Sequence, residues 1–147
     1  MPSVQSSIHS AISIVNAIAT GKGATLGISK KIDVTVKTLS GKGITIESDG
    51  KTISSRLINE VIKRIIPTNE LAKTKLEISL NSEIPTGYGL KSSSAISSAV
   101  SLGCAKLFRP DMTETEILQI GVDASIKTKV SLTGAYDDAC GCYYGGF

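Results

Sequence analysis

Apolar residues recur at every second position in two stretches of the chain, as expected for strands that bury one face. The stretches are Ile28 to Thr38 and Lys75 to Asn81. Their apolar positions are Ile28, Ile32, Val34 and Val36, then Leu76, Ile78 and Leu80. A short apolar run predicts another buried strand at Ser10 to Val15. The glycine turn at 40–43 leads into a further strand, Ile44 to Ser48, and Asp49-Gly50 is typical of a tight turn.

Apolar spacing of three and four residues predicts three helices. The first covers Arg56 to Ile66, the second Ser92 to Leu107, and the third Thr113 to Lys127, which opens with a capping box. Cys142 to Phe147 resembles the opening of a strand. This order of elements predicts an α+β fold, with a mixed sheet and helices packed on one side of it.

A glycine loop joins the strand that ends near Asn81 to the helix that begins near Ser92. Glycines let a backbone turn with positive φ and approach an anion closely, and a helix N-terminus favours negative charge. Lys91 adds a cation, and the serines can cap the helix or reach a phosphate. The loop is therefore either a polyphosphate cradle or an ordinary turn with a helix cap. Its candidate ligands are Pro85, Gly87, Tyr88, Gly89, Leu90, Lys91, Ser92, Ser93, Ser94 and Ala95.

Composition narrows the class of protein. The 147 residues suit one domain, and tryptophan is absent, so the core must be aliphatic. The net charge of +3 is mild and the lysines are scattered, which argues against a nucleic-acid partner. No run is apolar enough to span a membrane. Cys104, Cys140 and Cys142 have no metal-ligand spacing, which favours free thiols in the cytoplasm.

Three blocks of sequence resemble the GHMP kinase superfamily. The pattern from Pro85 to Ala95 looks like the second motif of that group, and Ala11 to Ala24 is similar to its first. The block Leu132-Thr-Gly-Ala-Tyr-Asp-Asp-Ala-Cys-Gly141 resembles the archaeal-type shikimate kinases. The resemblance implies a fold like domain 2 of ribosomal protein S5. It also implies that residues 1–147 form the N-terminal, ATP-binding domain, with the C-terminal domain and its third motif absent.

An acidic pair, Asp137-Asp138, is either a solvated turn or a buried base or metal ligand. The resemblance favours Asp138 as the acid that meets the substrate hydroxyl, with Asp137 second. Lys22 is either a surface lysine or a cation that stabilises the transferring phosphoryl group. By the same resemblance Ser93 holds Mg²⁺. The position of the usual second ligand carries Lys127, and Asp123 is the nearest substitute.

The resemblance implies an ATP-dependent kinase that uses Mg²⁺ and phosphorylates shikimate, a small molecule on the route to aromatic amino acids. Asn16, Thr133 and Gly134 are the candidate substrate contacts. Another substrate such as homoserine, or a non-catalytic domain that binds a nucleotide or RNA, stays open. Half a kinase would expose a sheet edge, so we also expect that the chain can associate with copies of itself.

Overall fold

Within the described residues of the computed structural model (3–15, 22, 24–48, 55–82, 92–128, 140 and 142–144), four strands form one sheet. The strands are β1 (Ser3–Val15), β2 (Ala24–Ser40), β3 (Gly43–Ser48) and β4 (Thr74–Ser82), in the spatial order β1-β2-β4-β3. β2 pairs antiparallel with both neighbours, and β3 pairs parallel with β4. The expected mixed sheet is confirmed.

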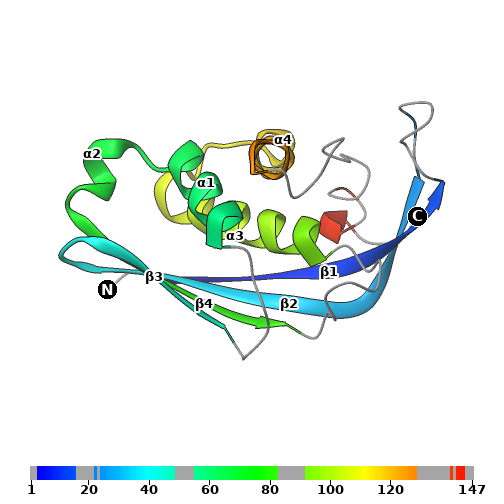
Figure 1. Cartoon of the computed structure of the whole chain (residues 1–147), viewed down its shortest axis with the longest axis horizontal. Coiled ribbons are helices and arrows are strands. Elements are labelled where there is room, and N and C mark those ends of the chain that lie inside the picture. The colour runs from blue at the N-terminus through cyan, green and yellow to red at the C-terminus, as the bar shows by residue number, and fades with distance from the viewer. Residues whose placement is uncertain are drawn as a thin grey trace.

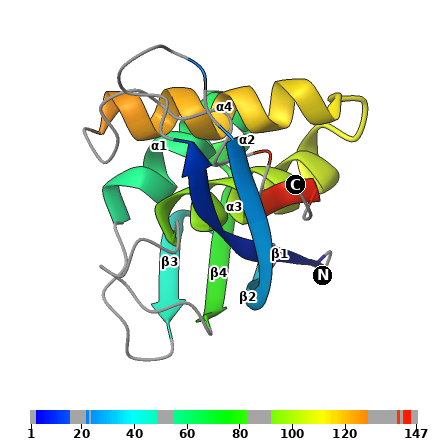
Figure 2. The same ribbon diagram turned by 90° about the vertical axis from the view of Figure 1, so that its right-hand side faces the viewer.

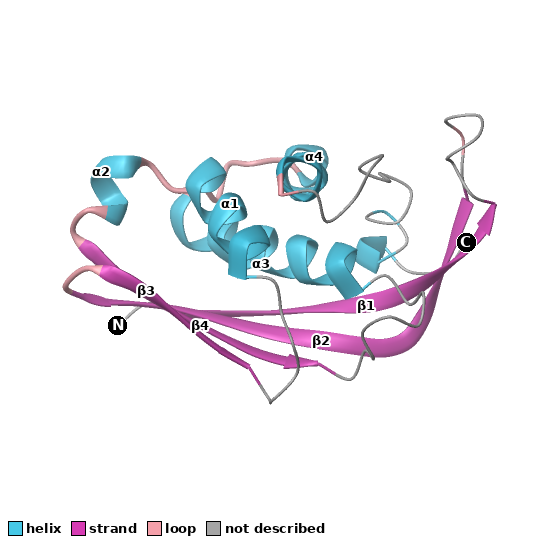
Figure 3. Ribbon diagram, viewed as in Figure 1, coloured by secondary structure: helices cyan, strands magenta, loops and turns pink. Residues whose placement is uncertain are grey.

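All the described helices lie on one face of this sheet (Figures 1 and 3). They are α1 (Ser55–Ile65), α2 (Thr68–Leu71), α3 (Ser92–Phe108) and α4 (Glu114–Lys127). Figure 2 shows α4 above α3, so that α3 lies between α4 and the sheet. The expected α+β architecture is confirmed. In the part of the chain that the structure describes, no helix is both long and apolar enough to cross a membrane.

The core between the sheet and the helices is aliphatic, as the absence of tryptophan requires. Alternate residues of β2 and β4 point toward the helices, and α1 buries the apolar face that its spacing predicts. The largest fully buried side chains are Ile32, Val34, Val36, Leu57, Ile58, Ile62, Ile65, Ile66, Leu76, Ile78 and Leu118. The other face of the sheet is polar, where the Ser7 hydroxyl donates to an Asp33 carboxylate oxygen at 2.6 Å.

α3 packs unusually closely because its buried residues are small. It contacts β1, β2, α1 and α4. A Cβ atom on Gly103 would lie 2.9 Å from Cγ2 of Val36, and one on Gly121 of α4 would lie 3.2 Å from the Ser97 hydroxyl. The buried Ser6 hydroxyl of β1 donates to the Ala99 carbonyl at 2.8 Å, a bond between residues 93 positions apart. Glycine and serine therefore set the depth at which α3 sits.

Turn and capping residues explain where β3 and α4 begin. Gly41 and Gly43 adopt φ of 119° and 109° in the turn after β2, a region that glycine tolerates best. The turn does not make a hairpin, because β4 lies between β2 and β3. At α4, the Glu116 amide donates to the Thr113 hydroxyl at 3.2 Å and the Thr113 amide donates back to the Glu116 carboxylate. The predicted capping box is confirmed.

Three expectations about the elements were incomplete or wrong. β1 begins at Ser3 and not at Ser10, because inward-facing serines such as Ser6 hide the alternation of the strand. The four-residue α2 was not predicted. Cys142–Tyr144 are helical and not a strand, and Cys142 is fully buried in the core. The turn expected at Asp49-Gly50 lies outside the described residues.

We expect Gly103→Ala to lower the free energy of unfolding by about 1 kcal/mol, because the new methyl group overlaps Val36. At an unconstrained helix position alanine is more stable than glycine by roughly the same amount. A loss of stability on Gly103→Ala would therefore itself indicate a steric overlap. Thermal unfolding followed by circular dichroism measures it. In a double-mutant cycle, Val36→Ala removes the methyl group that the new side chain meets. The loss of stability in the double variant should therefore be smaller than the sum of the losses in the two single variants. A Gly103→Ala chain more stable than the parent would contradict the close packing.

Candidate nucleotide site

The end of β4 and the start of α3 frame the glycine loop, as the sequence predicts. β4 ends at Ser82 and α3 begins at Ser92. The loop residues Pro85, Gly87, Tyr88, Gly89, Leu90 and Lys91 lie outside the described residues. The 17-residue α3 presents the free amide groups and the positive dipole end of its first turn here, which attract an anion.

The first turn of α3 holds the serines expected to meet phosphate. Ser92 and Ser93 belong to the helix, Ser94 is half-buried and Ala95 is fully buried. The Ser97 hydroxyl donates a hydrogen bond to the Ser94 carbonyl at 3.1 Å. This bond involves a carbonyl oxygen of the first turn and none of its backbone amides. Backbone amides at the start of a helix are the groups that can attract an anion, so the predicted phosphate site would depend on them.

Strand register brings the connection that carries Lys22 to the same end of the sheet. Ser82, the last residue of β4, pairs with Ile32 of β2, and β2 extends from there back to Ala24. Lys22 precedes Ala24 and is exposed. The paired ends of β1 and β2 curve toward the helix side (Figure 1). The start of β2 and the end of β4 thus point to the same end of the sheet, and Asn16 lies outside the described residues.

α4 packs against α3 where Gly121 lies beside Ser97. The helix ends before the buried Thr128, whose hydroxyl donates to the Ala124 carbonyl at 2.9 Å. Thr133, Gly134, Asp137 and Asp138 lie outside the described residues, so their roles stay predictions.

Beyond that segment, the chain is anchored to the start of α4. The Tyr144 hydroxyl donates to the Glu114 carboxylate at 3.1 Å, and the rings of Tyr143 and Tyr144 meet edge to face with centroids 4.9 Å apart. Burial and the neighbouring Glu114 carboxylate raise the pKa of Tyr143. Sequence reasoning missed this contact, since nothing in the local pattern links residues 30 positions apart.

Asp123, the expected substitute for the second metal ligand, is described by the structure. It lies on α4, is half-buried and accepts a hydrogen bond from Gln119 at 2.9 Å, whereas Gly121 and Ser125 occupy the buried side of the helix. Its role as a metal ligand stays a prediction. Among the described residues, no group of three or more His, Cys, Asp or Glu side chains could hold a metal ion.

Comparison with known proteins fits this arrangement. The family model for the GHMP kinases N terminal domain matches residues 56–146. The chain belongs to the GHMP kinases. Membership of this kinase family implies the use of ATP.

Curated relatives in this family carry a more specific name. The shikimate kinase of Pyrococcus furiosus is 39% identical over 93% of this chain and 50% of its own length. The shikimate kinase of Thermoplasma acidophilum is 32% identical over 95% of this chain and 46% of its own length. The chain thus spans about half the length of the curated relatives it matches.

Solved structures of the family share the fold. Homoserine kinase from Cytophaga hutchinsonii superposes with a TM-score of 0.72 at 21% identity, covering 97% of this chain and 47% of that chain. Mevalonate kinase from Methanococcus jannaschii gives 0.73 at 17% identity, covering 98% and 52%. At such identities the likeness shows the fold alone. It confirms the expected N-terminal domain architecture of a GHMP kinase.

Thiol reactivity offers a test of how tightly α3 is packed. Burial raises the pKa of the Cys104 thiol from 9.0 to about 12, so this thiol stays protonated where an exposed one ionises. At pH 8 we expect a disulfide reagent such as DTNB to react rapidly with the half-buried Cys140 alone, and with all three cysteines after unfolding. Cys140→Ser should abolish the fast phase and Cys104→Ser should leave it intact. The reverse pattern would disprove the packing of α3.

The same pKa shift predicts how stability depends on pH. Between about pH 9 and pH 12 the unfolded thiol loses its proton while the folded Cys104 keeps it. The unfolded state then binds fewer protons, so this group makes stability fall as the pH rises through that window. Below pH 9 its contribution is constant. Cys104→Ala should therefore flatten the alkaline limb of a plot of unfolding free energy against pH, and an unchanged limb would contradict the burial of this thiol.

Proposed function

We propose that this chain is the nucleotide-binding part of an ATP-dependent shikimate kinase. The observation that carries the proposal is its similarity to curated shikimate kinases, which are 32–39% identical over 90–97% of the chain. The product would be shikimate 3-phosphate with ADP, on the route to chorismate and the aromatic amino acids. The partner is therefore a small molecule, and the exclusion of nucleic acid remains a prediction.

The phosphates of ATP would lie at the start of α3. In the proposed complex the amide groups of Ser92, Ser93 and Ser94 and the glycines of the preceding loop donate hydrogen bonds to phosphate oxygens. Lys91 would neutralise part of their charge. The geometry that supports this is the strand, loop and helix order at Ser82 and Ser92, with the positive helix end exposed to the loop.

The acid would be Asp138, with Asp137 beside it. In the transfer step the substrate hydroxyl oxygen bonds to the γ-phosphorus while the bond to the bridging oxygen of ADP breaks, and Asp138 receives the hydroxyl proton. Lys22 would stabilise the charge on the transferring group. Asn16, Thr133 and Gly134 would orient shikimate through hydrogen bonds.

We include Mg²⁺ in the proposal because the side chain expected to hold it offers an oxygen ligand. The Ser93 hydroxyl is a hard oxygen ligand of the kind that Mg²⁺ prefers, and it would hold the ion. When bound, the ion would neutralise phosphate charge. The chain's own contribution is to hold this hydroxyl at the start of α3.

The first test is ADP release from ATP and Mg²⁺ with shikimate, homoserine, mevalonate or no acceptor. We expect release that depends on shikimate alone. The assay is run on the chain as printed and on the chain joined to the part of the Pyrococcus furiosus shikimate kinase that it does not match. Turnover of homoserine or mevalonate instead would replace the proposed substrate. Nucleotide binding without turnover in either form would favour a non-catalytic domain.

The second test is Asp138→Asn in the form that turns over. We expect kcat to fall by about a thousandfold or more, in the upper range for removal of a catalytic acid or base, while the Kd for ATP stays within about threefold. Asp111→Asn, an exposed change in the link before α4, is the matched control and should behave as the parent. Lost ATP binding with normal kcat at saturation would remove Asp138 from the proposed role.

A further inference from the structure

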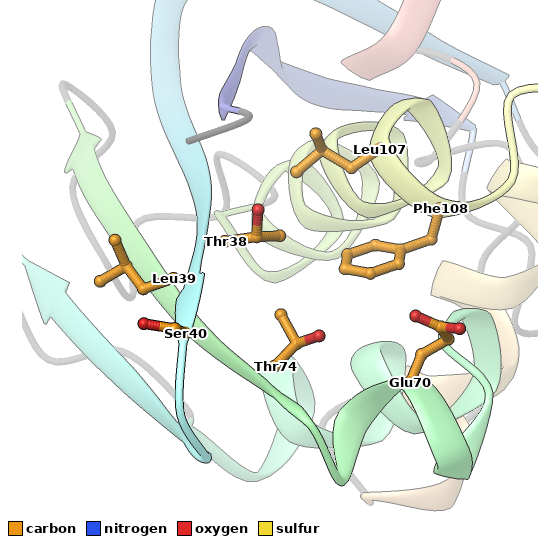
Figure 4. A pocket seen from close by; sticks show the side chains of 7 residues that line it. All are labelled: Thr38, Leu39, Ser40, Glu70, Thr74, Leu107 and Phe108. Atoms are coloured by element: carbon orange, nitrogen blue, oxygen red, sulfur yellow. The ribbon is translucent and has the colours of Figure 1, made fainter.

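A pocket lies at the opposite end of α3 from the proposed phosphate site (Figure 4). It encloses about 450 Å³, within the range of pockets that bind small molecules. The lining residues come from the end of β2, from α2, from the start of β4 and from the end of α3. They are Thr38, Leu39, Ser40, Glu70, Thr74, Leu107 and Phe108. At about 1.5 Å per residue, the 17-residue α3 places this pocket roughly 25 Å from its first turn.

The topology of the domain builds this pocket. Ser40 pairs with Thr74, so β2 ends where β4 begins. α2 sits immediately before β4, and its Glu70 amide donates to the Pro67 carbonyl at 3.0 Å, which fixes the turn that presents the glutamate. α3 ends at Phe108 above these strand ends. All seven lining residues belong to the described part of the chain.

The polar groups of the pocket favour a cation that donates hydrogen bonds. Glu70 is the only charged residue among those that line it, and its carboxylate can only accept. The Thr38 and Thr74 hydroxyls can each accept as well. Figure 4 shows the Glu70 carboxylate, Thr74 and the Phe108 ring facing the same space. An anion would meet the carboxylate there, whereas an ammonium group would find acceptors and an aromatic ring.

Lys73 already shows that an ammonium group can approach this carboxylate. Its Nζ lies 3.7 Å from the Glu70 carboxylate oxygen, and the two side chains are 67% and 42% exposed. A surface pair at that distance contributes little to stability, so a better-placed cation can displace it. Leu107 and Phe108 are half-buried and provide an apolar wall of the pocket.

We propose that this pocket binds a small primary ammonium compound with a short apolar or aromatic body. The ammonium group donates to Glu70 and to a threonine hydroxyl, and the apolar body packs against Leu107 and Phe108. This site is separate from the proposed kinase centre and does not depend on it. Binding can therefore be measured without ATP or shikimate, and its failure would leave the kinase proposal untouched.

The test is a titration of the ¹⁵N-labelled chain with phenethylamine, followed by amide chemical shifts. We expect saturable shifts centred on Ser40, Thr74 and Phe108. The neutral 2-phenylethanol should bind at least about tenfold more weakly, the usual loss when a charge-assisted hydrogen bond is removed. The anion 3-phenylpropionate should cause no saturable shift there. Equal affinity for the three probes, shifts centred on Ser94 and Ala95, or no saturable shift with phenethylamine would overturn the proposal.

Two variants test the role of the carboxylate. Glu70→Gln should weaken phenethylamine binding about tenfold or more, whereas Lys73→Gln should strengthen it by about threefold because the competing cation is gone. Glu60→Gln is the matched control, since Glu60 also lies on a helix, pairs with Arg64 at 3.1 Å and does not line the pocket. Unfolding midpoints show that each variant is folded. Parent-like binding by a folded Glu70→Gln chain would reject the site.

Discussion

The close approach of α3 to the sheet is the contact on which the rest of the domain depends. Gly103 leaves no room for a side chain beside Val36, and the Ser6 hydroxyl joins β1 to the carbonyl of Ala99. Because α3 also contacts α1 and α4, its depth determines where those helices lie. The position of the first turn of α3 follows from the same contact.

The close packing of α3 on the sheet would also hold the proposed phosphate site, at the first turn of the helix, in place. A helix end attracts anions only through amides that are held in place, and catalysis of phosphoryl transfer relies largely on positioning. The buried Ala95 and the Ser97–Ser94 hydrogen bond fix the first turn from within.

Regular apolar periods made much of this fold predictable from the sequence. The strand periods of β2 and β4 and the helical period of α1 were read correctly, because apolar and polar positions separate cleanly there. The start of β1 was missed where serines replace apolar residues, and the order β1-β2-β4-β3 depends on long-range pairing that no local pattern records. Around the candidate site, the start of α3 was predicted from glycine and serine chemistry. The role of Asp123 stays a prediction, because spacing along a chain does not determine which face of a helix a carboxylate occupies.

One mechanical consequence follows from the small residues of α3. Gly103 is flanked in the helix by Leu102 and Cys104, so a rotation of the helix about its axis would turn a larger side chain against Val36. Packed cores of this kind shift between discrete arrangements and do not deform gradually. α3 therefore behaves as a rigid element. It keeps a fixed separation between whatever is held at its serine end and whatever touches Phe108 at the other.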